Sequence, residues 1–442
     1  MPAAPADSAL YGRLFGDAEA AQLFGDSAEI RAMLLVEGAL ARVQGALGLI
    51  PADAAAFIDR AAMEVQIDPA ALAGETALNG VPVPGLLAAF RKAAGAPGPM
   101  QYLHWGATSQ DIMDTALALR LRPILALWGR RLDAVLTALA TLVEAGATQP
   151  MAARTYGQFA TPTSFGAVVA GWGWPLLDWK ARLDPLSDAV LQVSLSGAAG
   201  TLAAMGPQGP QVRTALAEAL GLRDPGYSWH SNRTAPGDLA RYAAGLAGAL
   251  GKLGEDMLLL SQSGLAEVGF RGGAGGSSTM PQKQNPVAAS ALVALARQVI
   301  GLSGLVQGAA LHRQQRDGAA WFGEWLTLPQ LCISTSRMLA LAADLAVSLQ
   351  PDRAAMLRLL EDGPGLIHAE ALTFALATQM PRPEAAAAVK EICLAAQSSG
   401  TPLLQLAAQR FPGIEGVAIV AAGGLGTAHA EALAFAARVR GG

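Results

Sequence analysis

The chain has few cysteines, few charged residues and no excess of positive charge. Only Cys332 and Cys393 occur among 442 residues. Both lie in apolar surroundings, which is typical of buried free thiols in a reducing compartment and not of a disulfide framework. The 31 lysines and arginines are outnumbered by 35 aspartates and glutamates. Nucleic acid is therefore not an expected partner, because no surplus of cations is available to neutralise a phosphate backbone.

The sequence also lacks segments that would direct a protein to a membrane or hold it there. The first nine residues contain neither a basic stretch nor an apolar run, so we expect no secretory signal and a cytoplasmic location. Two uncharged stretches, 155–177 and 189–212, are interrupted by polar residues, glycines or prolines and do not offer about 20 continuous apolar residues. With 52% hydrophobic and 15% charged residues, we instead expect large helix-helix interfaces, including interfaces between subunits.

Metal-binding patterns are absent from the sequence as well. The five histidines are scattered, and no His-Glu-x-x-His pattern, paired Cys-x-x-Cys or aspartate-rich loop occurs. We therefore expect no metal.

Apolar residues recur at helical spacing along the whole chain, and no run alternates convincingly as a strand would. The pattern predicts an all-α fold with a central bundle of long helices, each apolar on more than one face, which other subunits complete. The predicted long helices span 27–49, 109–147 with a kink or break at Pro123, 162–183, 238–265, 286–312 and 321–349. We expect three helical domains, comprising residues 1–110, 111–350 and 351–442.

One glycine-rich loop carries the most specific chemical pattern. Residues 276–286 read GSSTMPQKQNP. Asn285 followed by Pro286 fits an N-cap and the first position of a helix, and a helix N-terminus beside Lys283 favours an anion such as a carboxylate. The order of residues is not that of a nucleotide-binding P-loop. From the glycines alone, a flexible connector between helices would be an equally good interpretation.

The full string resembles the signature of the aspartase/fumarase superfamily, GSSxMPxKxNP, at every specified position. The resemblance implies a long central helical bundle flanked by two smaller helical domains, and a homotetramer. It also implies that Ser277 is the catalytic serine and that Ser278, Lys283 and Asn285 bind substrate or hold the loop. A serine alkoxide is costly in water, so Ser277 requires a closed lid with nearby N–H groups or Lys283.

A second segment, HWGATSQD at 104–111, directly precedes a predicted helix. Thr108 or Ser109 is a natural N-cap, which by itself would explain the hydroxyl groups. The segment resembles the first conserved region of the superfamily. That resemblance implies that Thr108 and Ser109 bind a carboxylate and that His104 is an acid or base, although single histidines are more often structural.

The segment RTYGQFATP at 154–162 occupies the place of the second conserved region but departs from it. Tyr156 stands where many lyases of the superfamily have a histidine that serves as general acid, whereas Gln158 is kept as a substrate contact. The departure argues against adenylosuccinate or argininosuccinate cleavage. It resembles the cycloisomerase branch, where an aromatic residue stands at this place.

The segment HRQQRDGAAWFGEW at 312–325 resembles the bacterial 3-carboxy-cis,cis-muconate cycloisomerase branch. If this segment is helical, Arg313 and Arg316 share a face and could clamp carboxylates. A surface cluster of ion pairs with Asp317 and Glu324 is the alternative.

The segment WHSNR at 229–233 resembles the substrate-proximal turn of the same branch, but Thr234 follows where an acidic residue is often found. We leave the roles of His230 and Arg233 open.

Together these resemblances imply conversion of 3-carboxy-cis,cis-muconate to a carboxymuconolactone in the β-ketoadipate pathway. One substrate carboxylate adds to the conjugated alkene, so clamping and charge stabilisation suffice and no cofactor is expected. The expected partners are a small-molecule polycarboxylate substrate and further copies of the chain in a homotetramer with shared active sites. Two alternatives stay open: a fumarate-releasing lyase of the same superfamily, and a non-catalytic helical scaffold that retains the fold.

Overall fold

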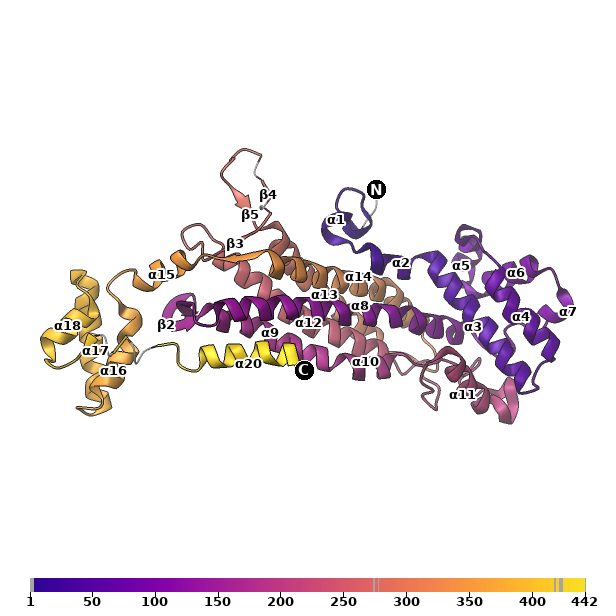
Figure 1. Cartoon of the computed structure of the whole chain (residues 1–442). Helices are drawn as coiled ribbons and strands as arrows, with labels where there is room; N and C mark the ends of the chain where they lie inside the picture. Colours follow the sequence, from indigo (N-terminus) through magenta and orange to yellow (C-terminus); the bar gives the residue numbers. More distant parts are fainter. Residues whose placement is uncertain (1–3, 273–274, 277, 417–418, 421–423, 442) are drawn as a thin grey trace. The chain divides into compact units, whose positions relative to one another are not determined.

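The computed structural model describes residues 4–272, 275–276, 278–416, 419–420 and 424–441. Helices dominate these residues and the strands are short, so the predicted all-α fold is confirmed (Figure 1). The chain divides into two compact units, each built from three stretches of sequence. Unit 1 contains Met1–Arg131, Trp179–Gly248 and Ala294–Ala340, and unit 2 contains Leu132–Asp178, Ala249–Val293 and Leu341–Gly442. The division into three domains stays a prediction.

Five long helices agree with the predicted ones to within a few residues at each end. They are α3 (Asp26–Ala46), α8 (Ser109–Gly146), α12 (Thr234–Leu260), α13 (Val287–Ala309) and α14 (Gly318–Ser348). Pro123 lies inside α8 without ending it. After α3, Gly48 adopts a φ of 76°, a left-handed conformation that glycine tolerates at the end of a helix.

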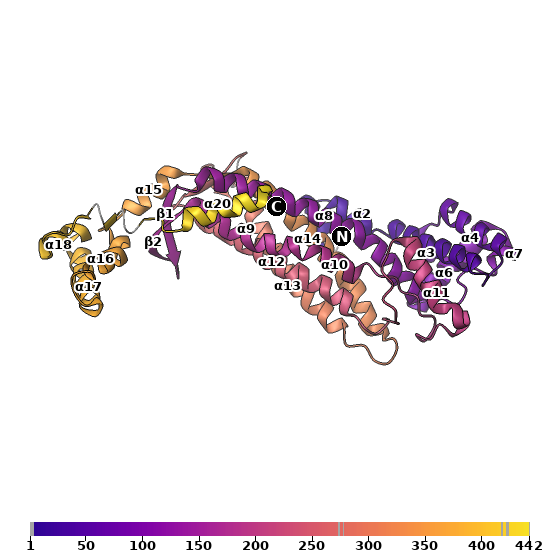
Figure 2. The same cartoon turned by 60° about the horizontal axis from the view of Figure 1, so that its bottom comes forward.

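Small residues explain how α3 packs in unit 1. A Cβ on Gly45 would lie 2.3 Å from the Cβ of Ala55, and a Cβ on Gly38 would lie 2.9 Å from that of Ala62. Glycine at these positions therefore allows α3 to approach α4 (Ala52–Glu64) closely. Figure 2 shows α3 and α4 together with α6, α7 and α11 at the same end of the unit. The remaining elements of unit 1 are η1 (Pro5–Asp7), α1 (Gly12–Phe15), α2 (Ala18–Phe24), η2 (Pro69–Leu72), α5 (Ala73–Asn79), α6 (Val83–Ala94), α7 (Pro97–Met100), α10 (Leu183–Val190), η3 (Ala203–Gln208) and α11 (Gly209–Leu220).

Unit 2 contains a β-hairpin that the helical pattern did not predict. β1 (Pro150–Thr155) pairs antiparallel with β2 (Gln158–Ser164), and α9 (Phe165–Ala181) follows. The expectation of no strand here, and of a helix from residue 162, was therefore wrong. The two turn residues, Tyr156 and Gly157, have φ values of 52° and 75°, which match the twist of a tight hairpin. The Ser164 hydroxyl accepts a hydrogen bond from the Ala167 N–H at 3.0 Å and so caps α9.

The rest of unit 2 combines two small strand pairs with helices. β3 (Val268–Phe270) pairs with β6 (Leu349–Pro351), and β4 (Gly275–Gly276) pairs with β5 (Gln284–Asn285). Near the C-terminus, buried Leu372, Val389 and Leu403 belong to a hydrophobic cluster of their own. The helices of this region are α15 (Arg353–Glu361), η4 (Leu366–His368), α16 (Ala369–Leu376), α17 (Arg382–Ser399), α18 (Leu403–Arg410) and α20 (Ala428–Gly441).

Helices α13 and α14 are long and apolar enough to cross a membrane by length and composition alone. In the most apolar window of each helix, 50% of α13 and 61% of α14 are buried inside the chain. Such burial is typical of core helices in a soluble protein.

Candidate active site

The start of α8 is organised by a buried aspartate. The carbonyl of Thr108 accepts the Asp111 N–H at 3.0 Å, so Thr108 is the N-cap of the helix. The Asp111 carboxylate reaches back and accepts the Thr108 N–H at 3.0 Å, which is one of the two bonds of a capping box. Within the part of the chain that the structure describes, the hydroxyls of Thr108 and Ser109 have no hydrogen-bond partner. These two predicted site residues are therefore available to a ligand at a helix N-terminus.

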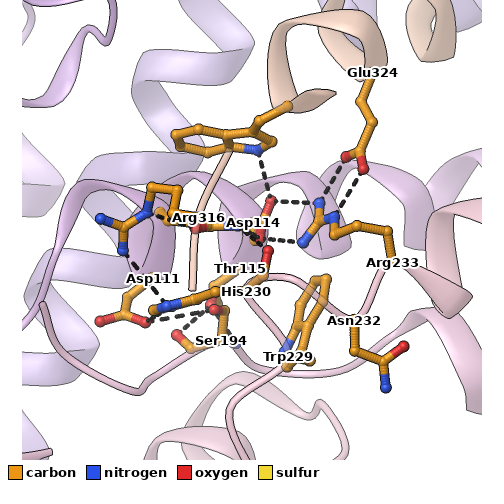
Figure 3. A network of polar contacts seen from close by, with 12 residues as sticks. Asp111, Asp114, Thr115, Ser194, Trp229, His230, Asn232, Arg233, Arg316 and Glu324 are labelled. Atoms are coloured by element: carbon orange, nitrogen blue, oxygen red, sulfur yellow. Dashed lines mark hydrogen bonds and ion pairs between the residues drawn. The ribbon is translucent and has the colours of Figure 1, made fainter. Parts of the chain in front are cut away.

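Asp111 also connects the start of α8 to two other segments of unit 1. Its carboxylate accepts the backbone N–H groups of Ser196 at 2.8 Å and Gly197 at 2.9 Å. It lies 2.7 Å from Nε2 of His230 (Figure 3). Because Asp111 is fully buried, these donors supply the hydrogen bonds that its charge requires.

His230 and Gln110 both contact the guanidinium of Arg316. Nε of Arg316 donates to Oε1 of Gln110 at 2.8 Å, and Nη2 lies 3.4 Å from Nδ1 of His230. Nη2 also donates to the carbonyl of Ala198 at 3.4 Å. Arg316 is thus held beside the start of α8 by groups from three different segments (Figure 3).

A second buried network lies next to the first. The guanidinium of Arg233 donates to Asp114 at 2.7 and 3.1 Å and to Glu324 at 2.7 and 2.6 Å (Figure 3). Burial lowers the pKa of Arg233, but the two carboxylates outweigh it and keep the guanidinium charged. Burial raises the pKa of Glu324, against the opposing effect of Arg233. Two-pronged pairing of this kind joins α8, the 229–233 turn and α14 in a fixed geometry.

His104 is paired with a glutamate from α3. Its Nδ1 lies 2.6 Å from Oε1 of Glu37, whose side chain is fully buried. Burial lowers the pKa of His104, but the charge and hydrogen bond of Glu37 outweigh it, so the pKa is raised above its ordinary value. His104 has a φ of 66°, and 16% of its side chain is exposed. A histidine held in this way can present its other nitrogen as a proton donor.

Arg313 and Arg316 do not share a helix face. Residues 310–317 form a loop between α13 and α14. The loop ends at Asp317, whose carboxylate caps α14 by accepting the Ala319 N–H at 3.0 Å. The helical arrangement considered for the two arginines was therefore wrong. The side chain of Arg313 is 82% exposed and pairs with Asp317, as in the surface alternative, whereas Glu324 pairs with Arg233 instead.

The described residues of the GSSTMPQKQNP segment lie in unit 2, where β4 pairs with β5 and α13 follows (Figure 1). Ser277 lies outside the described residues. Ser278 and Lys283 are exposed, and Asn285 is half-buried. Pro286, and not Asn285, has the carbonyl that begins the α13 ladder by accepting the Ser290 N–H at 3.1 Å, so the predicted capping position was wrong by one residue. The preceding β5 pairing holds Asn285 extended.

The second predicted region forms the tip of the β1–β2 hairpin in unit 2. Tyr156 and Gln158 are both exposed there. The side chain of Gln158, the predicted substrate contact, is therefore accessible.

The predicted site residues thus fall into two groups. Unit 1 contains His104, Thr108, Ser109, Arg313 and Arg316, and unit 2 contains Gln158, Ser278, Lys283 and Asn285. The structure adds Glu37, Gln110, Asp111 and Asp114, which the sequence reasoning did not select. Gln110 and Asp111 stand in the HWGATSQD segment, whereas the only sequence signal of Glu37 and Asp114 is an acidic residue among apolar helix positions. Among the described residues, no group of three or more His, Cys, Asp and Glu side chains could hold a metal ion.

Comparisons with known proteins agree on one family. A family model described as lyase matches residues 26–301. The 3-carboxy-cis,cis-muconate cycloisomerase of Pseudomonas aeruginosa is 39% identical over 388 residues, covering 87% of this chain and 84% of that protein. The structure of 3-carboxy-cis,cis-muconate lactonizing enzyme from Pseudomonas putida matches with a TM-score of 0.90 and 33% identity over 98% of this chain and 100% of that one. The structure of fumarate lyase from Mesorhizobium sp. BNC1 matches with a TM-score of 0.89 and 35% identity over 98% and 99% of the two chains.

Proposed function

The chain belongs to the lyase family, and on that premise we propose that it is a cycloisomerase that converts 3-carboxy-cis,cis-muconate to a carboxymuconolactone. The observation that carries this proposal is the 39% identity, over most of both chains, to an enzyme of that name. The match to the lactonizing enzyme over the full length of that structure agrees with it. The protein is an enzyme of the intramolecular lyase type.

The reaction conserves all atoms and needs no redox step. One carboxylate oxygen of the substrate forms a bond to an alkene carbon, the π bond breaks, and the adjacent carbon takes up a proton. Negative charge accumulates on the carboxylate conjugated to that carbon before the proton arrives. The enzyme must hold the substrate in the reactive conformation and stabilise this charge.

The unit 1 residues supply groups suited to the carboxylates. Arg316 is a fixed cation, and Thr108 and Ser109 offer hydroxyl groups at a helix N-terminus. His104, held by Glu37, acts as an acid or as a donor to a carboxylate. In this proposal Arg313 is a further clamp that a bound polycarboxylate draws away from Asp317.

The unit 2 residues supply the proton-transfer group and further contacts. Ser277 transfers the proton, and Ser278, Lys283 and Asn285 bind the substrate or hold the loop around it. Gln158 is a further substrate contact. Tyr156 in place of a histidine leaves the hairpin without the general acid of many related lyases.

We place this activity in a cytoplasmic homotetramer with active sites shared between chains. An exposed face of α13 supports the assembly. It consists mostly of small residues spaced alternately three and four positions apart, which suits close packing against another helix. Its residues are Val287, Ser290, Ala294, Arg297, Gly301, Gly304 and Gly308.

An ultraviolet assay tests the activity. We expect purified protein to remove the diene absorbance of 3-carboxy-cis,cis-muconate. We expect Ser277→Ala to lower kcat by roughly 10²–10⁴-fold, the usual contribution of a positioned proton-transfer group. An unchanged absorbance with the wild-type protein would reject the proposal, and full activity of Ser277→Ala would reject only the role of that serine.

The fumarate lyase match supports one second candidate, a lyase that releases fumarate from a succinyl-amine substrate. Fumarate formation from such substrates, together with no change in carboxymuconate, would favour it. Absence of turnover with either substrate would favour a non-catalytic scaffold.

A further inference from the structure

We propose that His230 is a positioning residue whose imidazole links the buried carboxylate of Asp111 to the guanidinium of Arg316. In this way it fixes the edge of Arg316 that binds a substrate carboxylate. This inference rests on the proposed function, because it concerns how that substrate is held.

The hydrogen-bonding partners of His230 determine which of its two ring nitrogens carries the hydrogen. A carboxylate only accepts, so Nε2 of His230, 2.7 Å from Oδ1 of Asp111, carries the hydrogen. In the neutral ring Nδ1 then has the free lone pair. Arginine only donates, so the 3.4 Å contact from Nη2 of Arg316 falls on this lone pair. The buried carboxylate thereby selects the tautomer that Arg316 requires.

The surroundings of His230 prevent it from turning away. The residue is only 2% exposed, and its carbonyl accepts a hydrogen bond from Nε2 of Gln110 at 2.9 Å. The other end of the Gln110 amide accepts from Nε of Arg316 at 2.8 Å. Gln110 and His230 therefore hold the guanidinium at two points, each from a buried position.

One edge of the guanidinium is left for a ligand. Gln110, His230 and Ala198 occupy Nε and Nη2 of Arg316, whereas Nη1 has no hydrogen-bond partner among the residues that the structure describes. Arg316 lies in a loop and not in a helix, so its side chain would sample many rotamers without these contacts. Holding it in advance reduces the entropy lost when a carboxylate binds.

The same carboxylate organises the neighbouring binding groups. Asp111 caps the start of α8 through the Thr108 N–H, and it orients Arg316 through His230. Thr108, Ser109 and Arg316 are therefore set by one buried charge. Because Asp111 holds these three groups at fixed positions, they suit a substrate whose carboxylates are a fixed distance apart.

Two substitutions separate this role from simple structural support. The amide oxygen and nitrogen of asparagine are bonded to Cγ, so they can take the place of Nδ1 of histidine. The amide of glutamine is one bond further from the backbone, so its oxygen and nitrogen lie near the place of Nε2. His230→Asn therefore keeps an acceptor for Arg316 and loses the bond to Asp111. His230→Gln keeps a donor for Asp111 and loses the acceptor for Arg316.

The two variants should rank oppositely in two measurements. We expect the KM for carboxymuconate of the His230→Gln variant to be about ten times that of the His230→Asn variant. We expect His230→Asn to lower Tm more than His230→Gln does, because it leaves the buried carboxylate short of a donor. His429→Gln, the same change at an exposed position, is the control and should alter neither value. The same rank order in KM and Tm would overturn the proposal.

A double-mutant cycle locates the effect. In the Arg316→Ala background, the additional rise in KM from His230→Gln should disappear. A His230→Gln effect that persists undiminished in this background would show that His230 acts through another group and would overturn the proposal.

Binding of propane-1,2,3-tricarboxylate, measured by calorimetry on the full-length protein, keeps the two proposals distinguishable. Even if carboxymuconate is not turned over, Kd should rise more for His230→Gln than for His230→Asn, and most for Arg316→Ala. No binding to the wild-type protein, or equal Kd values for all variants, would overturn the positioning role.

Discussion

At the scale of single residues, the pairing of His104 with Glu37 governs the protonation of a predicted catalytic group. Glu37 outweighs burial and raises the pKa of His104, so the ring stays protonated further into the neutral range than an ordinary histidine. The charged ring can then act on a carboxylate or donate a proton. The carboxylate that arranges this lies on α3, 67 residues away in sequence.

We predict that Glu37→Gln lowers kcat/KM at neutral pH by about tenfold, a part of the contribution of a general acid. Without the carboxylate the pKa of His104 falls, so the loss of activity with rising pH should begin at lower pH. The measurement is a pH profile of kcat/KM for both proteins. An unshifted descending limb would show that His104 does not act in its protonated form.

Stability provides a check on the same pair that does not involve turnover. Since the folded pKa of His104 is raised, the pair stabilises the fold fully below the pKa of an unfolded histidine. This stabilisation is lost as the pH rises through the raised pKa. The difference in free energy of unfolding between the wild type and Glu37→Gln should therefore narrow toward alkaline pH in urea titrations.

The sequence predicted one half of this pair and not the other. His104 is predicted because its segment resembles the first conserved region of the superfamily. Glu37 stands inside an apolar helix pattern, where its only signal is that a carboxylate there must meet a partner when buried. Which partner it meets depends on how α3 packs against the 104–109 loop, and that packing has no signature in either segment alone.

At the scale of secondary-structure elements, helical periodicity predicted the long helices but not the β1–β2 hairpin. Long helices repeat their apolar pattern over many turns, so an error of a few residues at the ends does not hide them. The hairpin strands are short and half-exposed, and they lack clear alternation. Its turn gives little signal either, because Tyr156 adopts a positive φ that is uncommon for a bulky residue.

The hairpin is held in unit 2 by a charge pair that can be tested. Nη2 of Arg154 lies 2.7 Å from Oε2 of Glu267, which is buried. Burial raises the pKa of Glu267, against the opposing charge of Arg154. We predict that Arg154→Met, which leaves this carboxylate unpaired, lowers the free energy of unfolding by about 3–5 kcal/mol at neutral pH. Urea titration provides the measurement.

The double variant Arg154→Met/Glu267→Gln serves as the matched control, because it removes the buried charge as well. It should recover most of the lost stability. The deficit of Arg154→Met should also shrink at acidic pH, where Glu267 binds a proton in the folded state. A deficit that is equal at both pH values would mean that Arg154 stabilises the hairpin by packing against Phe159 instead of by charge.

At the scale of the whole molecule, the site residues that the sequence predicts are divided between the two compact units. His104, Thr108, Ser109 and Arg316 belong to one compact unit, and Ser278, Lys283 and Asn285 belong to the other. The family resemblance implies active sites shared between chains, but each motif is assigned separately, so no motif by itself indicates which segments of which chain meet. Assembly is therefore the level at which the proposed site can be tested most directly.

The exposed face of α13 offers a position where only a partner chain would be disturbed. A Cβ on Gly304 would meet no atom of its own chain within 4 Å, beyond the helix backbone itself. Glutamate is also the better helix former by roughly 0.5–1 kcal/mol. Gly304→Glu should therefore fold as a single chain at least as well as the wild type, while placing a charge where a neighbouring helix would pack. We expect mass measurement in solution to give a tetramer for the wild type and smaller species for this variant.

Gly98→Glu is the matched control, because Gly98 is an exposed helical glycine on α7 whose added Cβ also meets nothing. It should remain tetrameric and active. If active sites are shared between chains, Gly304→Glu should lose carboxymuconate turnover together with the tetramer, with its helical circular dichroism retained. A dissociated variant with full activity would show that each chain completes its own site, and an intact tetramer would show that this face of α13 is not the interface.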